Sequence, residues 1–301
     1  MTAATLKNIA VIGGTGDLGH VIVDQLAAAG IFNLVVITRG SNAKTFPPGV
    51  KTVAADYESL DDLTVAFRGF DAVVCVVPGH LEAPLLRILE AAIAAEVKRF
   101  IPSEFGSDHR NPSARSVPLS ASKIRVDEAL QKAAEAGRIE YTSILGGPWI
   151  EWIMTCDTGM CLPKRKFYVH EDGNVRFGLS TRKAFGDAVV GVLKRPDATR
   201  NQILTIEVIN LTQNRIMELV KEALPDIDIE VIKVSTKERY ERGVQKLLSG
   251  VFDASVIEDI VLRFVYDPEL QLTFDTNATN ELLGVQRMTE AEFKELVKTL
   301  A

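Results

Sequence analysis

The sequence has few cysteines, no long apolar run and no excess of positive charge. The three cysteines are too few for a disulfide framework, and Cys156 and Cys161 lack the further ligands of a zinc site. We therefore expect free or buried thiols and no metal. No apolar run reaches the roughly 18 residues that a membrane span needs. The net charge of −6 argues against a nucleic-acid-binding surface, because neutralising phosphates requires an excess of Lys and Arg.

A signal peptide is also missing, because the first residues lack its basic, apolar and cleavage segments. We expect a cytoplasmic protein that binds neither nucleic acid nor a membrane, as a monomer or a homodimer. The 301 residues, 47% apolar and 25% charged, are typical of a globular chain that is long enough to bury a sizeable core.

Short β-branched runs alternate with stretches of helical spacing through the first half of the chain. The expected strands are 9–12, 34–38, 51–54, 71–77, 99–102 and 141–145. The expected helices are 18–29, 59–69, 82–96 and 120–136. This alternation predicts right-handed βαβ crossovers. The fold class is therefore α/β, a Rossmann-type doubly wound parallel sheet with helices on both faces.

The alternation breaks after Pro148. We expect residues 1–150 to form an NAD(P)-binding domain and residues 151–301 to form mainly a smaller, C-terminal substrate-binding region. A segment near 184–210 is expected to rejoin the main sheet. A turn at Asp172–Gly173 predicts a β-hairpin.

Three glycines, Gly13, Gly16 and Gly19, follow the first strand at the spacing G-x-x-G-x-x-G. In a dinucleotide site they allow the sharp turn, the close approach of a pyrophosphate and the packing of helix on strand. The pyrophosphate then meets the helix N-terminus, which adds Thr15, Asp17 and Leu18 to the expected contacts. The alternative is a tight turn in which the glycines serve packing only.

The end of the second strand distinguishes NADPH from NADH. Residues 38–44 contain no carboxylate to bind a ribose hydroxyl, but they contain Arg39 and Lys44, which can bind a 2′-phosphate. Alternatively, Arg39 is a solvated loop residue. Asp56 either lies beside the adenine or caps the next helix. Val77 and Pro78 end the fourth strand, where we expect backbone contact with the cofactor.

The Tyr-x-x-x-Lys pair of short-chain dehydrogenases is missing, because no tyrosine has a lysine four places on. The best-placed lysine is Lys123, and four places before it stands Leu119. Lys123 follows the fifth strand and its long loop, which brings it to the cofactor edge of the sheet. The alternative is a plain surface lysine.

Four segments together carry a family resemblance: GGTGDLG at 13–19, RFIPSEFG at 99–106, Lys123 in SKIRVDEAL, and YTSILGGPW at 141–149. They resemble the NmrA-like family, and within it the isoflavone reductase-like branch of atypical short-chain reductases. The resemblance implies an NADPH-dependent reductase of a small aromatic, phenolic or enone-type metabolite. It also implies that Lys123 is the general acid or base, and that Ser103, Glu104 and Phe105 border the nicotinamide.

The Gly146–Trp152 segment departs from plant members of this branch and looks more like fungal ones. Trp149, Trp152 and Phe105 either stack on an aromatic substrate or pack in the core. A second function remains open, an NAD(P)-sensing regulatory protein without turnover. The resemblance implies that such sensors tend to lack the lysine, so Lys123 favours the reductase.

Overall fold

A seven-stranded parallel sheet forms the centre of the molecule in the computed structural model, which describes residues 6–40, 44–109, 111–267, 269–270 and 279–301. The strand order is β10-β6-β5-β4-β1-β2-β3. These strands are β1 (Asn8–Ile12), β2 (Asn33–Thr38), β3 (Lys51–Ala54), β4 (Ala72–Cys75), β5 (Arg99–Ile101), β6 (Glu140–Leu145) and β10 (Gln202–Thr205). The predicted fold class, an α/β parallel sheet with smaller C-terminal elements, is confirmed.

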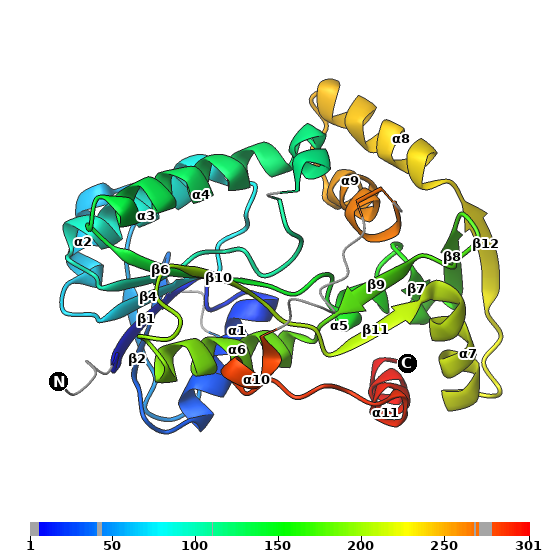
Figure 1. The fold of residues 1–301 in the computed structure, drawn as a ribbon, viewed down its shortest axis with the longest axis horizontal. Coiled ribbons are helices and arrows are strands. Elements are labelled where there is room, and N and C mark those ends of the chain that lie inside the picture. The colour runs from blue at the N-terminus through cyan, green and yellow to red at the C-terminus, as the bar shows by residue number, and fades with distance from the viewer. Residues whose placement is uncertain (1–5, 41–43, 110, 268, 271–278) are drawn as a thin grey trace.

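Helices cover both faces of this sheet (Figure 1). One layer holds α1 (Asp17–Ala28) and α6 (Arg182–Lys194); the other holds α2 (Leu60–Phe67), α3 (Glu82–Ala94) and α4 (Ser120–Glu135). Side chains alternate along β1 accordingly: Ile9 and Val11 are buried in the core with α1 and α6, whereas Ala10 and Ile12 are buried in the core with α2, α3 and α4. A strand buried on both faces has to be apolar throughout, which explains the continuous apolar runs of the sequence.

The fourth strand is shorter than its apolar run predicts. Asp71 is not in the strand; its carboxylate accepts the backbone N–H groups of Lys7 and Asn8 at 2.8 Å each. At the other end, Val76 still donates to the carbonyl of Ile12 before the chain leaves the sheet. The run therefore predicted the strand correctly and its two ends incorrectly.

Two small sheets lie beyond the main one. β9 (Arg176–Leu179) pairs with β11 (Ile209–Thr212), and β8 (Lys166–His170) lies between β7 (Met160–Cys161) and β12 (Glu230–Val234). The predicted hairpin at Asp172–Gly173 is wrong, because β8 and β9 belong to different sheets. The turn itself exists, with Gly173 at a φ of +72°, but each flanking strand finds a partner far along the chain.

Two helices that pack against each other, α8 (Thr236–Leu248) and α9 (Ala254–Tyr266), lie beyond the start of α4 in Figure 1. They pack on the chain that precedes α4, where Val117, Val256, Ile260 and Phe264 belong to a small core separate from the two main ones. The remaining helices are short or C-terminal: α5 (Ile150–Ile153), α7 (Gln213–Ala223), α10 (Asn280–Leu283) and α11 (Glu290–Leu300), with 3-10 turns η1 (Pro112–Ser116) and η2 (Leu162–Lys164).

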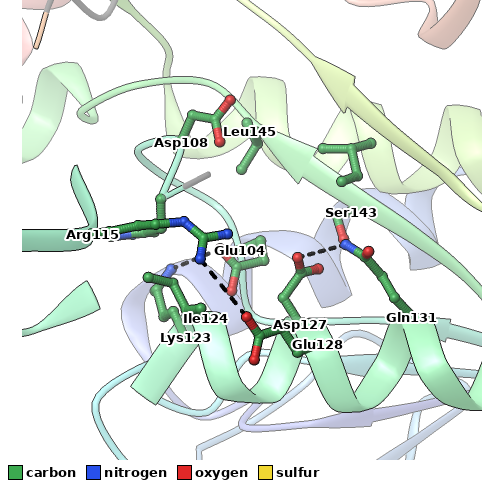
Figure 2. A pocket seen from close by; sticks show the side chains of 12 residues that line it. Glu104, Asp108, Arg115, Lys123, Ile124, Asp127, Glu128, Gln131, Ser143 and Leu145 are labelled. Carbon is green, nitrogen blue, oxygen red and sulfur yellow. Dashed lines mark hydrogen bonds and ion pairs between the residues drawn. The ribbon is translucent and has the colours of Figure 1, made fainter. Parts of the chain in front are cut away.

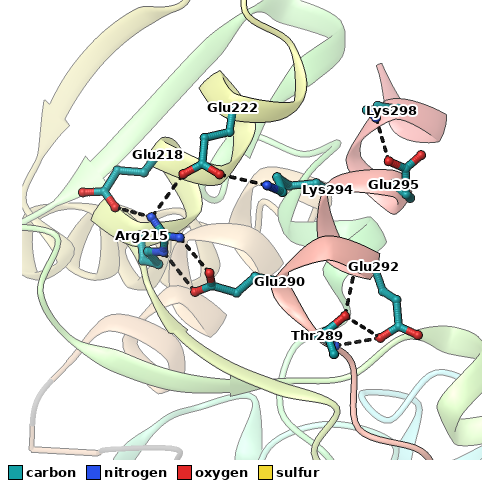
Figure 3. A network of polar contacts seen from close by, with 9 residues as sticks. All are labelled: Arg215, Glu218, Glu222, Thr289, Glu290, Glu292, Lys294, Glu295 and Lys298. Carbon is teal, nitrogen blue, oxygen red and sulfur yellow. Dashed lines mark hydrogen bonds and ion pairs between the residues drawn. The ribbon is translucent and has the colours of Figure 1, made fainter.

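The C-terminal helix α11 is held on α7 by charged side chains (Figure 3). Arg215 contacts Glu290 at 2.7 Å and Glu218 at 2.6 Å, and Lys294 contacts Glu222 at 2.9 Å. All these side chains are partly exposed, so each ion pair by itself contributes little to the stability of the fold. The network mainly fixes the position of α11 on α7. Among the described residues, no helix is both long enough and apolar enough to cross a lipid bilayer.

Candidate functional site

The glycine turn joins β1 to α1 at the carboxyl edge of the sheet. Gly13 has a φ of +84°, and a Cβ atom there would lie 2.7 Å from the backbone carbonyl of Val76. A Cβ on Gly19 would overlap the carbonyl oxygen of Gly13, so this residue allows the helix to start against the strand. Gly16 caps α1 without a side chain, which leaves the first N–H groups of the helix open to an anion.

A fourth glycine of this turn is constrained although the motif does not require it. A Cβ on Gly14 would lie 2.7 Å from a methyl group of Val36 on the neighbouring strand. Thr15 is half-buried and Asp17 exposed, whereas Leu18 packs in the core and can contribute only its backbone N–H to a ligand. The turn therefore presents backbone rather than side chains outwards, as a pyrophosphate site requires.

Two cations lie beyond the second strand. Arg39 is exposed, and its guanidinium lies 5.8 Å from the ring centroid of Tyr57. Lys44 is also exposed, while residues 41–43 between them lie outside the described part of the chain. The Tyr57 hydroxyl donates to the carbonyl of Ile37 at 2.7 Å, and burial raises its pKa to about 12, so the ring is a fixed neutral wall of this corner.

Asp56 does not cap the next helix. Ser59 is the N-cap of α2, where its hydroxyl accepts the N–H of Asp62. The Asp56 carboxylate instead accepts the N–H of Glu58 at 2.9 Å, in a turn that leaves the residue exposed beside β3. The capping alternative is therefore wrong, and a place beside the adenine stays a prediction.

Lys123 lies in the first turns of α4 and reaches across to two other segments. Its Nζ atom donates to the carbonyl oxygen of Ser103 at 3.1 Å and lies 3.4 Å from Oε2 of Glu104. The stem of the side chain passes over Gly79, just after Val77 and Pro78 at the end of β4. Only 18% of the Lys123 side chain is exposed, so it is not a plain surface lysine. The structure thus brings together the ends of β4 and β5 and the start of α4.

An apolar cavity of about 300 Å³, the aromatic pocket, opens on one side of Lys123. Phe105, Trp149 and Trp152 line it, and the indole Nε1 of Trp149 donates to the carbonyl of Phe105 at 3.0 Å. Phe105 also packs edge-on against Phe185 in the core. These aromatic side chains pack against the core on one side, as the second interpretation predicted. On the other side they face a cavity, so stacking on an aromatic substrate stays a prediction.

Helix α9 supplies the wall that the sequence did not predict: Ile257, Val261, Phe264 and Val265. A signal for it existed. Ile257, Val261 and Val265 are spaced four apart and form a second apolar stripe beside Val256 and Ile260, which pack in the small core. A helix with two apolar stripes has two faces to cover.

A second cavity, the polar cavity, lies on another side of Lys123 (Figure 2). It measures about 280 Å³ and is lined by α4, by the end of β6, by the start of β10, and by the loop after β5. The side chains that give it its character are Glu104, Asp108, Arg115, Asp127 and Gln131. Burial raises the pKa of the Glu104 carboxyl above its usual value, while the nearby Lys123 charge acts in the opposite direction.

His109 lines both cavities beside Lys123. Its Nδ1 atom lies 2.9 Å from the hydroxyl of Ser120, and its ring meets Phe264 edge-on at 5.2 Å. Burial, and secondly the charge of Lys123, hold its pKa well below the usual value, so the imidazole is neutral at pH 7. His80 lies at the mouth of the aromatic pocket against Phe252.

The cysteines lie outside this constellation. All three are free, and burial raises the pKa of Cys75 to about 12, so its thiol is inert. In the described part of the chain, no three His, Cys, Asp or Glu side chains are grouped as metal ligands.

Comparisons with known proteins identify a family and related solved folds. The model of the NmrA-like family matches residues 5–261. Oxidoreductase poxI of Penicillium oxalicum is 31% identical over 92% of this chain and 90% of its own. Isoflavone reductase homolog P3 of Arabidopsis thaliana is 28% identical over 72% and 74%. Among solved structures, AtPrR2 with NADP+ and (+)pinoresinol has a TM-score of 0.78 at 21% identity, covering 99% of this chain and 100% of that one.

Proposed function

Because the chain belongs to the NmrA-like family, we propose that it is an NADPH-dependent reductase of a small aromatic, phenolic or enone-type metabolite, with Lys123 as general acid. Named relatives in this family are oxidoreductases and isoflavone reductase homologues, so the family and the class of protein predicted from the sequence are confirmed. One observation supports the finer proposal: the Lys123 amine lies between the carboxyl edge of the sheet and an aromatic pocket.

The residues at that edge fit a dinucleotide. The glycine turn is open where a pyrophosphate would approach, since the Gly16 position has only the Gly13 carbonyl within 4 Å of an added Cβ. The N–H groups at the start of a helix bind phosphate oxygens. Those expected to do so here belong to Thr15, which lies in the turn, and to Asp17, Leu18 and Gly19, which begin α1. Arg39 and Lys44 are exposed and would bind the 2′-phosphate. Asp56, also exposed, would lie at the adenosine end.

The nicotinamide end would lie along Val77, Pro78, Ser103, Glu104 and Phe105. Val77 and Pro78 follow β4, and Ser103 to Phe105 follow β5, so both segments end at the same edge as the glycine turn. NADPH would supply the hydride there. These two segments would hold the nicotinamide ring beside the aromatic pocket and limit the access of water to it.

Lys123 handles the proton of the reaction. The ammonium group donates to the substrate oxygen on which negative charge develops, a role that typically contributes about 10²- to 10⁴-fold to the rate. The Ser103 carbonyl orients the ammonium group by accepting a hydrogen bond from one of its three N–H donors. The other two N–H donors remain for Glu104 and for a substrate.

The aromatic pocket selects a flat apolar substrate. Trp149 and Trp152 offer ring faces, and Val261 and Phe264 of α9 close the opposite wall. Residues 151–301 contribute Trp152 and the whole α9 wall, which supports a mainly substrate-binding role for this region. AtPrR2 is described with pinoresinol, an aromatic ligand, and we extend the class of ligand, but not the compound, to this chain.

The test is NADPH oxidation by the purified protein across a panel of quinones, enones, aromatic ketones and phenolic ethers. We expect turnover of at least one aromatic compound, with a loss of at least 100-fold in Lys123→Met and unchanged NADPH binding. Turnover that survives this substitution would remove Lys123 from the mechanism. Tight NADPH binding without oxidation of any compound would favour the NAD(P)-sensing alternative.

A further inference from the structure

The polar cavity gives Lys123 a second connection to solvent, separate from the aromatic pocket. Lys123 and His109 line both cavities, but the other walls differ: β6, β10 and α4 bound the polar cavity, whereas α9 and the 147–152 segment bound the aromatic pocket. At the rim of the polar cavity, the side chains of Arg115 and Glu128 are 58% and 62% exposed. Water can therefore reach the polar cavity while a substrate fills the aromatic pocket.

The Ser143 hydroxyl gives the polar cavity a buried group that water would satisfy. The residue is 1% exposed and lines the cavity from β6, and its hydroxyl has no hydrogen-bond partner among the described residues. Leaving a buried hydroxyl without a partner is unfavourable, and water in a polar cavity of sufficient size satisfies such groups.

Glu104 stands between this water and the lysine. Its carboxylate lies 3.4 Å from the Lys123 Nζ atom and also lines the polar cavity, while the residue is 8% exposed (Figure 2). The charged and titratable groups around it are Lys123 and Asp127 from α4, and Asp108 from the loop after β5. Burial raises the pKa of Glu104, which brings it closer to neutral pH than that of a solvated carboxyl.

We propose that Glu104 relays protons from water in the polar cavity to Lys123. The inference rests on the proposed reductase function, in which each turnover takes one hydride from NADPH and one proton from Lys123. The substrate oxygen gains that proton, and Lys123 is left as a neutral amine. The Glu104 carboxylic acid then transfers its proton to the amine, and the resulting carboxylate is reprotonated from bulk solvent through the water of the cavity, so that solvent supplies the one proton consumed in each turnover. Glu104 thus acts through Lys123, as a positioning and relay residue.

The first test needs no substrate. Glutamate side-chain carboxyls of the purified protein are ¹³C-labelled, and the Glu104 signal is assigned by its absence in Glu104→Gln. In Lys123→Met, we expect the pKa of Glu104 to rise further, because the positive charge that lowers it is removed. Arg115→Met is the matched control, since it removes a cation from the rim of the same cavity and should leave the pKa of Glu104 unchanged. An unchanged pKa of Glu104 in Lys123→Met overturns the relay, whatever the enzyme reduces.

The second test uses a substrate identified from the panel. Glu104→Ala should lower kcat at least tenfold and raise the solvent deuterium isotope effect, because proton delivery becomes limiting. Added acetate, a carboxylic acid small enough for the cavity, should restore activity several-fold, and equal chloride should not. Loss of activity with neither rescue nor a larger isotope effect would make Glu104 merely structural and overturn the proposal.

Ser143→Val provides a second variant that leaves the Lys123 contacts in place. It removes the unpartnered hydroxyl and narrows the water space, so the solvent isotope effect should rise here too, without rescue by acetate. An unaltered isotope effect would contradict the water path. If the wild-type protein oxidises no compound of the panel, the reductase proposal fails, whereas the titration of Glu104 still tests the link between Glu104 and Lys123.

Discussion

A Cβ atom on Gly79 would overlap the Cε atom of Lys123. The stem of the proposed acid therefore lies against the backbone of the loop after β4, and it can do so only because residue 79 is glycine. This contact joins the end of the fourth strand to the first turns of α4, and it fixes where the amine points.

We expect Gly79→Ala to reduce turnover at least tenfold, because the methyl group displaces a flexible side chain and a shift of about 1 Å in a catalytic group can cost 100-fold. The thermal midpoint should change by no more than a few degrees, since Gly79 has no left-handed φ and the lysine can move. The measurements are kcat, NADPH affinity by fluorescence, and the thermal midpoint.

The double variant with Lys123→Met provides the control for this contact. If Gly79→Ala acts through the lysine, it should add nothing to Lys123→Met. A single variant with full activity, or an additive loss in the double variant, would contradict this account.

Arg39 should decide the preference for NADPH over NADH. Hydrogen bonds to charged groups contribute about 1.5–3 kcal/mol, so we expect Arg39→Ala to weaken NADPH binding by about 10- to 100-fold and to leave NADH binding nearly unchanged. Isothermal titration with both cofactors measures this. Lys51→Ala is the matched control. Lys51 is the first residue of β3 and so lies at the amino edge of the sheet, away from the carboxyl edge where the cofactor is proposed to bind, and its loss should affect neither cofactor. Equal losses for both cofactors in Arg39→Ala would remove the 2′-phosphate assignment.

The glycine turn and the parallel sheet could be predicted from the sequence because both depend on local pattern. Gly13 and Gly19 are required by contacts within one strand–turn–helix unit, and the apolar runs follow from burial on both faces of the sheet. The position of Lys123 near the carboxyl edge of the sheet was also predictable, because parallel strands end at the same edge.

The wall formed by α9 and the polar cavity could not be predicted in this way. Val261 and Trp149 line the same pocket although about a hundred residues of chain separate them, and no local pattern specifies that arrangement. The prediction of a hairpin at Asp172–Gly173 was wrong for the same reason, because the strand partners lie far along the chain. Gly173 makes a tight turn, but a Cβ there would lie 2.6 Å from the Asn214 side chain, so the turn is shaped by a distant segment. Local rules describe the turn and leave the strand partners undetermined.

Asp259 should be the charged residue that matters most for the stability of the α8–α9 pair. Asp259 is fully buried, and its carboxylate lies 2.8 Å from the guanidinium of Arg239. Arg239 is itself only 9% exposed. Asp259→Asn leaves that guanidinium buried without its counter-charge, which typically costs about 3–5 kcal/mol. Urea denaturation should show this loss. Arg242→Ala removes the other, largely exposed partner of Asp259 and should cost no more than about 1 kcal/mol. Similar losses in both variants would show that burial does not distinguish the two pairs.

His170 should make the protein sensitive to mild acid. Its Nδ1 atom lies 3.0 Å from the Thr236 hydroxyl, its ring stacks on Tyr266, and burial lowers its pKa to about 3 from an ordinary value of 6.5. Because the folded state binds the proton more weakly than the unfolded state, stability is complete above about pH 6.5 and falls as the pH drops toward 3. The slope approaches 1.4 kcal/mol per pH unit, so we expect a loss of about 2 kcal/mol between pH 7.5 and 5 from this residue.

The matched variant is His170→Gln, which lacks the titrating group but can keep a hydrogen bond to Thr236. Its unfolding free energy by urea denaturation should be lower than that of the wild type at pH 7.5, and should vary less with pH. His109, whose pKa burial also lowers, contributes in the same direction and remains in both proteins. Glu104 contributes in the opposite direction, because burial raises its pKa, and it too is common to both. The difference between the two pH slopes therefore isolates His170, and equal slopes would mean that its ring is not held neutral by the fold.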